Sequence, residues 1–386
     1  MKIVLFTHPS FLEHQSMPRY AKMLLQGMIE RGHEVEVWSP KARFYLLPIR
    51  ASLRKWLGYI DQYILFPFEV KLKLRYTSED SLFVFADQAL GPWVPLVRNR
   101  LHVIHCHDFL ALKSALGQIP ENPTSFSGKK YQNYIRNGFS KGKHFICISQ
   151  KTKEDLEDLH RDNIESLAVC YNGLNRPFTS LDPIESKRVL SKQLQIELST
   201  GYVMHIGGNQ YYKNRRGVLE IYESWRGSSS LNIPLLLIGS KPNDELIALR
   251  EESAFKKDIH FITSLSDDYV NCAYSGASCL LFPSLDEGFG WPIAEAMASG
   301  CPVITTNKAP MSEVGGAAAF YIDKKPIESI KFQQWKVASA NVLEKVLLLS
   351  KIQRDEVIKI SLEESKKFTY INSLNAIEAI YIEITK

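Results

Sequence analysis

A pair of carboxylates flanks a glycine-rich turn in the second half of the sequence. Glu287 and Glu295 are separated by seven residues, and Gly288 and Gly290 lie between them. The apolar run 279–282 before the turn predicts a buried strand, and the residues after the turn predict a helix. Glycines allow backbone N–H groups to face a ligand, and the N-terminus of a helix favours a phosphate. The pattern predicts a turn that binds phosphate, with two glutamates that hold hydroxyl groups.

A second glycine-rich segment follows the apolar run 202–206. It begins with the glycine pair 207–208 and continues to Lys213, with Arg215 and Arg216 close behind. Adjacent glycines let the backbone approach a ligand closely. Lys213 together with one of the two arginines would neutralise a diphosphate without a metal ion. The spacing leaves open which arginine takes part.

Polar residues also end an apolar run in the first half. His105, His107 and Asp108 follow directly on Val103 and Ile104. Two histidines at this spacing are more often polar residues at a strand end than a metal site, and no further ligands complete one. On the residues alone this stretch has no assigned chemistry.

The loop after the first apolar run, 3–7, differs from a dinucleotide-binding loop. An oxidoreductase with such a cofactor would carry Gly-x-Gly-x-x-Gly directly after that strand. Residues 7–11 instead read Thr-His-Pro-Ser-Phe, without glycine. Ser10 and Ser16 are candidates to line a site here, and Arg19, at the start of the next helix, is a candidate to meet an anionic ligand.

Length and composition describe an ordinary globular protein. The chain has 386 residues, of which 45% are hydrophobic and 23% charged, and this length favours two domains. No apolar run is long enough to cross a bilayer, and the apolar start is too short for a signal peptide, so we expect a cytoplasmic protein. The six cysteines lack paired metal-type spacing and suggest reduced core residues. A net charge of +5 is too mild to indicate nucleic-acid binding.

The order of apolar runs indicates two parallel sheets. Short apolar runs alternate with amphipathic ones, as in units that join parallel strands through helices. A polar stretch around 172–183 separates two series of such runs, and the last residues, 371–386, carry the apolar stripe of an amphipathic helix. The expected strands are 3–7, 34–38, 82–85, 103–105, 145–148 and 167–170 in the first series, and 202–206, 234–238, 259–262, 278–282, 303–305 and 319–322 in the second.

One segment, 41–76, is basic and aromatic. It has eight basic residues against two acidic ones, Asp61 and Glu69, and eight aromatic residues. Such a mixture suits the surface of an anionic membrane or a lipid-phosphate acceptor. The alternative is an inserted helix pair whose aromatic residues pack inward while the charges are solvated.

The motifs of the second half resemble a known family. Glu287-Gly288-Phe289-Gly290, then Glu295-Ala296-Met297-Ala298 and Gly300, then the run 302–304 occur in the order found in retaining, nucleotide-sugar-dependent glycosyltransferases of family 4. The resemblance implies the GT-B fold, an α/β architecture in which two Rossmann-like, doubly wound parallel-sheet domains face a cleft. It also implies that the C-terminal helix crosses back onto the first domain. The resemblance is strong over 202–322 and weak over 41–95.

The resemblance assigns roles to both domains. Residues 1–175 with 367–386 would bind the acceptor, and 176–366 would bind the nucleotide sugar. Lys213 and the backbone of 288–290 would stabilise the departing diphosphate. The residues implied for catalysis are His107, Lys213 and Glu287; for donor binding Gly208, Asn209, Lys213, Arg215, Arg216, Gly239, Leu265, Glu287, Gly288, Phe289, Gly290 and Glu295; and for acceptor binding Ser10, Arg19, His107 and Asp108.

Within these sets, Glu287 would hold hydroxyl groups of the donor sugar, Glu295 the ribose, and His107 the far side of the sugar. One position departs from the pattern: Asn209 stands where many relatives have arginine. The second cation is therefore Arg215 or Arg216, or it is missing. The resemblance implies neither a metal ion nor a cofactor, because the nucleotide sugar is a co-substrate.

The predicted activity is that of a retaining, metal-independent hexosyltransferase. It would move a sugar from GDP-mannose or a UDP-sugar to a glycan or lipid-linked acceptor, in the synthesis of a cell-surface polysaccharide or glycolipid. Two alternatives stay open. The chain could be a non-catalytic GT-B relative that binds a glycan or a partner protein, or a sugar-nucleotide epimerase with the same architecture.

Overall fold

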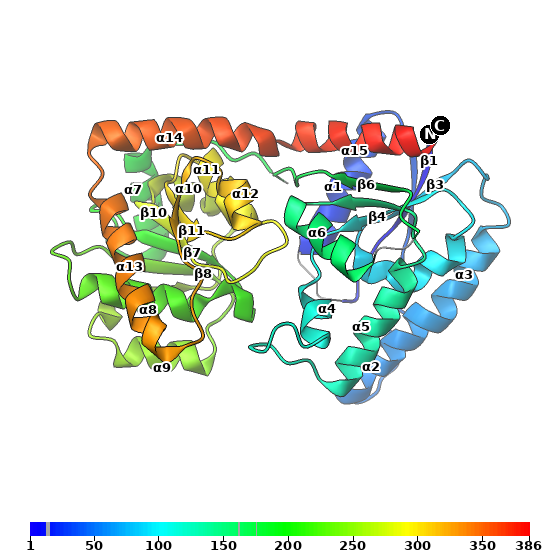
Figure 1. The fold of residues 1–386 in the computed structure, drawn as a ribbon, viewed down its shortest axis with the longest axis horizontal. Helices are drawn as coiled ribbons and strands as arrows, with labels where there is room; N and C mark the ends of the chain where they lie inside the picture. Colours follow the sequence, from blue (N-terminus) through cyan, green and yellow to red (C-terminus); the bar gives the residue numbers. More distant parts are fainter. Residues whose placement is uncertain (13–15, 161–162, 175) are drawn as a thin grey trace. The chain divides into compact units, whose positions relative to one another are not determined.

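The computed structural model describes residues 1–12, 16–160, 163–174 and 176–386 (Figure 1). The chain divides into two compact units. Unit 1 consists of Met1–Asn175 and Tyr370–Lys386, and unit 2 consists of Arg176–Thr369. Each unit has its own parallel sheet with helices packed around it.

The sheet of unit 1 has six parallel strands in the order β2-β1-β3-β4-β5-β6. Its two central strands are buried along their whole length because helices cover both faces of such a sheet. Phe6 and Phe85, from neighbouring strands, stack at 4.6 Å between ring centroids, and Trp93 lies beside them. The strands are β1 (Lys2–Phe6), β2 (Glu34–Trp38), β3 (Leu82–Phe85), β4 (His102–Cys106), β5 (His144–Cys147) and β6 (Ser166–Val169).

The sheet of unit 2 also has six parallel strands, in the order β12-β11-β10-β7-β8-β9. Counted within the unit, this is the order 3-2-1-4-5-6 of a dinucleotide-binding Rossmann fold, read from the other edge. The strands are β7 (Val203–Gly207), β8 (Leu235–Gly239), β9 (Ile259–Ile262), β10 (Cys279–Phe282), β11 (Val303–Thr306) and β12 (Ala319–Ile322). The twelve strands expected from the sequence are all confirmed in the described residues, with ends that differ by at most one position.

Helices account for most of the remaining described chain. In unit 1 they are α1 (Ser16–Glu30), η1 (Phe44–Leu46), α2 (Ala51–Ile60), the π-helical turn η2 (Asp61–Leu65), α3 (Phe66–Lys73), η3 (Gln88–Val97), α4 (Leu110–Ala115), α5 (Phe126–Phe139), α6 (Gln150–Leu159) and α15 (Tyr370–Ile384). In unit 2 they are α7 (Pro183–Leu194), η4 (Tyr211–Lys213), α8 (Arg215–Arg226), α9 (Asp244–Glu252), η5 (Lys256–Asp258), α10 (Asp267–Gly276), α11 (Trp291–Ala298), α12 (Met311–Gly315), α13 (Ser329–Leu347), α14 (Lys351–Ser365) and η6 (Lys366–Phe368).

The C-terminal helix α15 belongs to unit 1, which confirms that the chain crosses back (Figure 1). It packs on α1, where a Cβ at Gly27 would lie 2.3 Å from the side chain of Leu374. Leu374, Ile377 and Tyr381 of α15 are buried. The absence of a side chain at Gly27 therefore lets the two helices approach closely.

Candidate active site

Each sheet has one point where the strand order reverses. In unit 2 this point lies between β7 and β10, and in unit 1 between β1 and β3. In open sheets of this kind, ligands bind outside the carboxyl ends of the strands at the reversal. The loops that leave these four strands are therefore where function is expected.

In unit 2 the loops after β7 and β10 are joined directly. The N–H of Leu285 donates to the carbonyl of Tyr212 at 2.7 Å, and the side-chain amide of Asn214 donates to the carbonyl of Pro283 at 2.9 Å. Asn214 has a left-handed backbone (φ 50°) and caps α8 by accepting from the N–H of Gly217. These bonds bring the two sequence motifs of the second half to one place.

Lys213 and Glu287 form an ion pair at this junction. The Lys213 ammonium donates to both carboxylate oxygens of Glu287, at 2.8 and 2.9 Å. Both side chains are mostly buried, and the Ser284 hydroxyl donates to the same carboxylate at 2.8 Å. The lysine also lies over the Phe282 ring, 5.2 Å from its centroid. Two residues predicted to act on one ligand are thus in direct contact.

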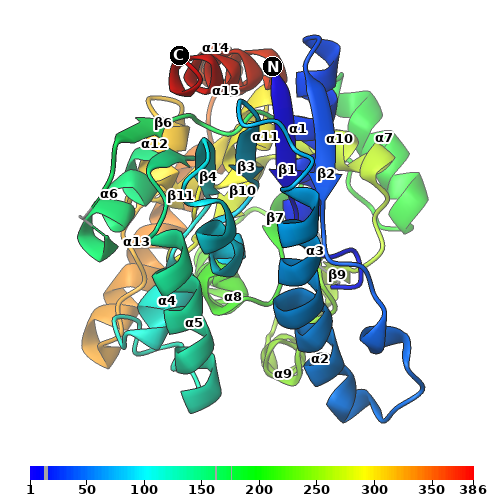
Figure 2. The same cartoon turned by 90° about the vertical axis from the view of Figure 1, so that its right-hand side faces the viewer.

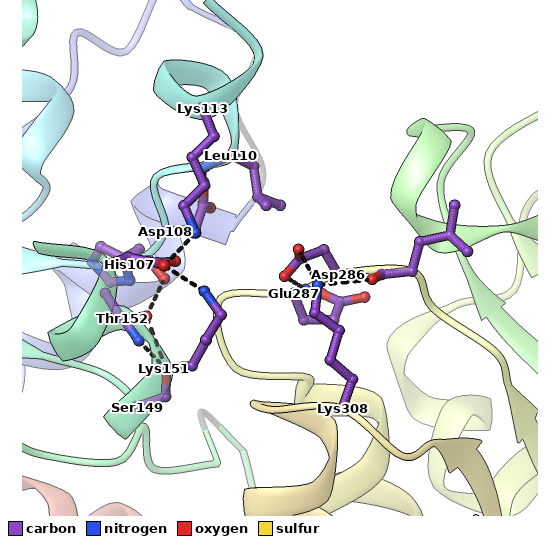
Figure 3. Close-up of polar contacts among 12 residues, drawn as sticks. His107, Asp108, Leu110, Lys113, Ser149, Lys151, Thr152, Asp286, Glu287 and Lys308 are labelled. Carbon is purple, nitrogen blue, oxygen red and sulfur yellow. Dashed lines mark hydrogen bonds and ion pairs between the residues drawn. The ribbon is translucent and has the colours of Figure 1, made fainter. Parts of the chain in front are cut away.

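A second ion pair follows on the same turn (Figure 3). Lys308 donates to the Asp286 carboxylate at 2.6 Å, and Asp286 accepts the N–H of Glu287 at 3.1 Å. The Thr306 hydroxyl donates to the carbonyl of Ser284 at 2.7 Å. Residues of β11 and its following loop therefore fix the backbone that carries Glu287.

Arg215, at the start of α8, is a buried cation without a carboxylate partner among the described residues. Its Nη1 donates to Asn209 Oδ1 at 2.5 Å and to the carbonyl of Ser240 at 2.8 Å. Its Nε and Nη2 are buried and have no hydrogen-bond partner among the described residues. Burial lowers the pKa of the Arg215 guanidinium because desolvation disfavours the charged form. An anion at this place would supply the missing hydrogen bonds and charge.

Arg216 is held elsewhere. Its guanidinium donates to Glu220 and Glu245 at 2.7 and 2.8 Å, and the side chain is about half exposed. Two carboxylates already neutralise this cation. Of the two arginines that the sequence left open, the structure puts Arg215 beside Asn209 and directs Arg216 toward α9.

The glycines of these loops permit close backbone contacts. Gly239 ends β8 with φ 132°, and a Cβ there would lie 2.2 Å from the carbonyl oxygen of Gly207. Gly290 has φ 98° and is the N-cap of α11. A proline lies in the first turn of this helix. Gly208 and Gly288 lie in the same two loops and are partly exposed.

Three other residues are predicted to bind the donor, two of them on the turn after β10 and its helix. Glu295 is one turn into α11 and accepts from the Tyr274 hydroxyl at 2.8 Å. The side chain of Phe289 is buried, and its ring lies 5.4 Å from that of Phe368. Leu265 is half-buried in the loop after β9, the edge strand. A ligand could therefore contact the backbone at Phe289 and the side chains of Glu287 and Glu295.

In unit 1, His107 follows β4 and is buried. Its Nε2 donates to the carbonyl of Ala86 at 2.8 Å, and its ring lies 4.4 Å from that of Tyr20. Burial lowers the pKa of His107, although Asp87 and the Ala86 carbonyl act in the opposite direction. The imidazole is therefore neutral at pH 7. The backbone carbonyl oxygen of His107 accepts from the Thr152 hydroxyl at 3.4 Å (Figure 3).

His105, two residues earlier, is fixed by two tyrosines. Its Nδ1 and Nε2 each lie 2.7 Å from a hydroxyl, that of Tyr20 on α1 and that of Tyr381 on α15. Burial lowers its pKa to about 3. Both ring nitrogens are occupied, so His105 holds helices and offers nothing to a ligand.

The other predicted residues of unit 1 are at the surface or at the strand end. Ser10 and Arg19 are exposed, and the side chain of Ser16 lies outside the described residues. Asp108 is half-buried, and its carboxylate accepts the N–H of Leu110 at 3.0 Å. Of these, Asp108 lies next to His107.

A pocket of about 240 Å³ lies at the reversal point of unit 1. At its base His8, after β1, pairs with Asp87, after β3, at 2.8 Å between Nε2 and Oδ2. Burial acts to raise the pKa of Asp87, but the hydrogen bond and charge of His8 outweigh it and lower that pKa. Tyr63 and Tyr131 line the wall, with their hydroxyls 2.7 Å apart.

The sequence prediction missed His8, Asp87 and the two tyrosines. His8 and Asp87 each come one or two residues after an expected strand, so their strand-end positions carried a usable signal. No sequence pattern relates Tyr63 to Tyr131, which come from η2 and α5. Among the described residues no group of three His, Cys, Asp or Glu is placed to hold a metal ion.

Two glycosyltransferase families match consecutive parts of the chain. Residues 17–176 match "Glycosyltransferase Family 4" and residues 186–332 match "Glycosyl transferases group 1". The chain is a family 4, group 1 glycosyltransferase with the GT-B fold. The second of these matches includes the glycine turn between Glu287 and Glu295.

Two curated relatives of this glycosyltransferase are named as O-antigen chain mannosyltransferases. The chain is 26% identical to O-antigen chain mannosyltransferase B of Escherichia coli over 62% of its length, and 26% identical to the O-antigen chain mannosyltransferase RfbU of Salmonella typhimurium over 64%. The matched regions span 60% and 62% of those two proteins.

Solved structures share the fold of this glycosyltransferase over nearly all of both chains. WaaG, described as a glycosyltransferase involved in lipopolysaccharide biosynthesis, superposes with a TM-score of 0.72 at 16% identity and covers 98% of this chain and 99% of its own. HepE of Anabaena, solved with UDP and glucose, also has a TM-score of 0.72, at 15% identity, with 99% and 100% covered. At this identity the likeness speaks for the fold.

Proposed function

We propose that this glycosyltransferase transfers a hexose from a nucleoside diphosphate sugar to a hydroxyl of a glycan or lipid-linked acceptor, with retention at the anomeric carbon. The observation that carries the proposal is the cationic centre at the reversal point of unit 2. Lys213 contacts Glu287 of the glycine turn. The desolvated Arg215, two residues later at the start of α8, contacts Asn209 and the carbonyl of Ser240. These groups suit a diphosphate, which supplies negative oxygens to both cations.

Unit 2 then acts on the leaving group. The bond between C1 of the sugar and the diphosphate oxygen breaks, while C1 bonds to the acceptor oxygen on the same face. The proton of the acceptor hydroxyl passes to the departing diphosphate. Lys213, Arg215 and the N–H groups of 288–290 stabilise the charge that develops on that diphosphate, and such preorganised stabilisation is usually the largest catalytic contribution.

The glutamates of unit 2 position the donor in this proposal. Glu287, held by Lys213 and Ser284, binds hydroxyls of the donor sugar, and Glu295 binds the ribose. Direct nucleophilic attack by Glu287 is disfavoured because its two oxygens are engaged by a lysine and a serine. Metal independence is part of the proposal, since the two cations can neutralise the diphosphate alone.

Unit 1 takes the acceptor. Neutral His107 faces the sugar, and the pocket of His8, Asp87, Tyr63 and Tyr131 binds the reacting end of the acceptor. The pocket is smaller than the roughly 300–1,000 Å³ that hold whole drug-sized ligands, so it suits one ring of a larger acceptor. Tyrosine rings offer apolar faces and hydroxyls, which suits a sugar.

The donor identity rests on the relatives. Two curated relatives are named as mannosyltransferases, which favours GDP-mannose, while HepE was solved with UDP and glucose. Both donors therefore belong in the first test. The same relatives favour a role in cell-surface polysaccharide synthesis.

Ligand-dependent thermal stability tests this proposal. The purified chain is heated with UDP, GDP, CDP, ADP or NAD, and with their sugar conjugates, with and without magnesium. A ligand at 100 times its Kd stabilises by about 2.7 kcal/mol, which raises the melting temperature by several degrees. We expect one nucleoside diphosphate to do so without magnesium, and the matching sugar nucleotide to support transfer. A folded protein that responds to none would favour a non-catalytic role.

A further inference from the structure

The surface of residues 41–76 has an unusual composition. Every exposed residue that the structure describes between Lys41 and Tyr76 is basic, apolar or aromatic. The set includes Trp56, Ile64 and Phe68, which are 61%, 64% and 63% exposed. We name these exposed residues the basic-apolar face. Large apolar side chains are costly to leave in water when they gather in one place, so such a face indicates a partner.

The π-helical turn η2 keeps the apolar residues of this face in line. Helices α2 and α3 run on from each other through η2 as one long helix (Figure 2). In an α-helix, residues four apart advance by roughly 40° around the axis at each step. The wider π turn cancels much of this drift, so the exposed Ile64 and Phe68 stay on one side. The same turn buries Asp61 and Gln62 on the other side.

Both acidic residues of the segment are withdrawn from the face. Asp61 is buried and accepts the N–H groups of three consecutive residues, Arg43 to Tyr45. Glu69 is paired with Arg43. Lys73 is paired with Glu36 of β2. Six of the eight basic residues have no ion pair among the described residues: Lys41, Arg50, Arg54, Lys55, Lys71 and Arg75.

The same contacts fasten a second piece of the face to the helix. Asp61 holds the turn η1 against α2 by accepting the N–H of Tyr45. The Tyr45 ring packs on Gly58 of α2, where a Cβ would lie 3.3 Å from the ring. Leu46 and Leu47, next in the chain, are exposed. The face is therefore a fixed surface formed by a turn and a helix.

We infer that the basic-apolar face docks on an anionic lipid membrane. Aromatic and aliphatic side chains would enter the boundary between headgroups and acyl chains, and the unpaired lysines and arginines would meet lipid phosphates. The face has net positive charge and no exposed carboxylate of its own segment, which argues for this occupant over a second copy of the chain, because two such faces would repel each other. No helix in the described residues is long and apolar enough to span a bilayer.

The membrane contact and the acceptor pocket share one element. Gln62 and Tyr63 of η2 line the pocket of His8 and Asp87, while Ile64 of the same turn is exposed on the basic-apolar face. Resting on the proposed function, this arrangement favours a lipid-linked acceptor over a soluble glycan. The lipid part would stay in the membrane while the sugar reaches the pocket.

Vesicle binding of the full chain tests the inference without any nucleotide. Partition is measured by co-sedimentation with vesicles of phosphatidylcholine, and of phosphatidylcholine mixed equally with phosphatidylglycerol. Two variants change the face: one replaces Arg54, Lys55 and Lys71 by Gln, and one carries Trp56→Ser and Phe68→Ser. The control replaces Lys192, Lys345 and Lys351 by Gln, exposed lysines of unit 2 without ion pairs in the described residues. The control matches the first variant in net charge.

We expect the wild type and the control to bind the mixed vesicles, more weakly at high salt. Because each basic residue near an anionic surface is worth about 1 kcal/mol, the triple variant should partition about 100-fold less. The aromatic double variant should lose at least about tenfold, and its melting temperature should stay unchanged because both side chains are exposed. Equal binding by the triple variant and the control would overturn the inference. So would wild-type binding that ignores phosphatidylglycerol, or a dimer that the face variants dissociate.

Failure here and failure of the proposed function can be told apart. If the chain transfers sugar to a soluble acceptor but does not bind vesicles, the proposed function stands and the membrane inference is wrong. If the chain binds anionic vesicles but no nucleoside diphosphate, the membrane inference stands and the proposed function is wrong.

Discussion

The reversal points of the two sheets differ in how their charges are satisfied. In unit 1, His107 is neutral and hydrogen-bonded to a carbonyl, and the Asp87 carboxylate is matched by His8. In unit 2, Lys213 shares a carboxylate with a serine, and Arg215 is buried with two nitrogens that have no partner among the described residues. A buried cation without its counter-charge is costly unless a ligand provides it. The two reversal points, although both lie at the carboxyl ends of parallel strands, thus differ: one suits hydroxyls and the other suits an anion.

The largest effect on transfer is expected from removing the Lys213 cation at the reversal point of the unit 2 sheet. Lys213→Ala should lower kcat/KM for transfer about 100- to 1,000-fold, because a charge-stabilising donor is lost. It should also destabilise unit 2 by about 3 kcal/mol, because Glu287 stays buried without its partner. Steady-state kinetics and thermal unfolding measure the two effects.

Lys325→Ala is the control for that variant, since Lys325 forms a similarly buried pair with Glu220 in the same unit. It should cost less stability than Lys213→Ala, because Glu220 keeps its ion pair with Arg216, and it should leave transfer nearly intact in the folded protein. If both variants lose transfer equally, the loss comes from unit 2 stability, and the contrast between the two reversal points has no catalytic meaning.

The two adjacent arginines offer a sharper comparison. Arg215→Met should weaken binding of the nucleoside diphosphate about 10- to 100-fold, the effect of losing charged hydrogen bonds. Arg216→Met should change it less than about twofold, because Glu220 and Glu245 already neutralise that side chain. Isothermal titration calorimetry measures both. The reverse ranking would show that the buried guanidinium serves structure alone.

The unit 1 pocket should respond to the acceptor and ignore the donor. Tyr131→Phe or His8→Gln should raise the KM for a glycoside acceptor about five- to tenfold, in keeping with the loss of one hydrogen bond. The Kd of the nucleoside diphosphate should not change. Tyr134→Phe, on the same helix but outside the pocket lining, is the control. An altered donor Kd in the pocket variants would contradict the separation of roles between the units.

Acid should destabilise both units through one buried histidine in each. Burial lowers the pKa of His105 and of His205 to about 3. The unfolded chain binds a proton near pH 6.5 while the folded chain does not, so the stability is complete above pH 6.5 and is lost as the pH falls toward 3. Each histidine contributes a slope of about 1.4 kcal/mol per pH unit.

Urea unfolding at several pH values measures how the free energy of unfolding changes with pH. His105→Gln and His205→Gln should each remove the contribution of one histidine to this slope. The His205 variant is expected to cost less at neutral pH. Its Nε2 is buried without a partner in the described residues, whereas both nitrogens of His105 are bonded to tyrosines. Slopes unchanged in both variants would mean that other groups control acid unfolding.

The sequence by itself determined the elements and the family. A strand of a parallel sheet is buried on both faces and therefore reads as a continuous apolar run, so all twelve strands could be located. The glycine turn between Glu287 and Glu295 carried the resemblance that indicated the fold. These signals are local: each depends on residues within one strand, one turn or one helix. The crossing of α15 followed from the resemblance, and its amphipathic stripe agreed with it.

Tertiary structure alone decided which polar groups share a partner. Lys213 meets Glu287 across 74 positions and His8 meets Asp87 across 79, because neighbouring parallel strands bring their carboxyl ends to one edge. Arg215 and Arg216 are adjacent in sequence but leave α8 in different directions, so only the fold separates a buried cation from a solvated one. Likewise, the withdrawal of Asp61 and Glu69 from the basic-apolar face depends on contacts with the turn at Arg43. Long-range contacts of this kind have no local pattern from which to predict them.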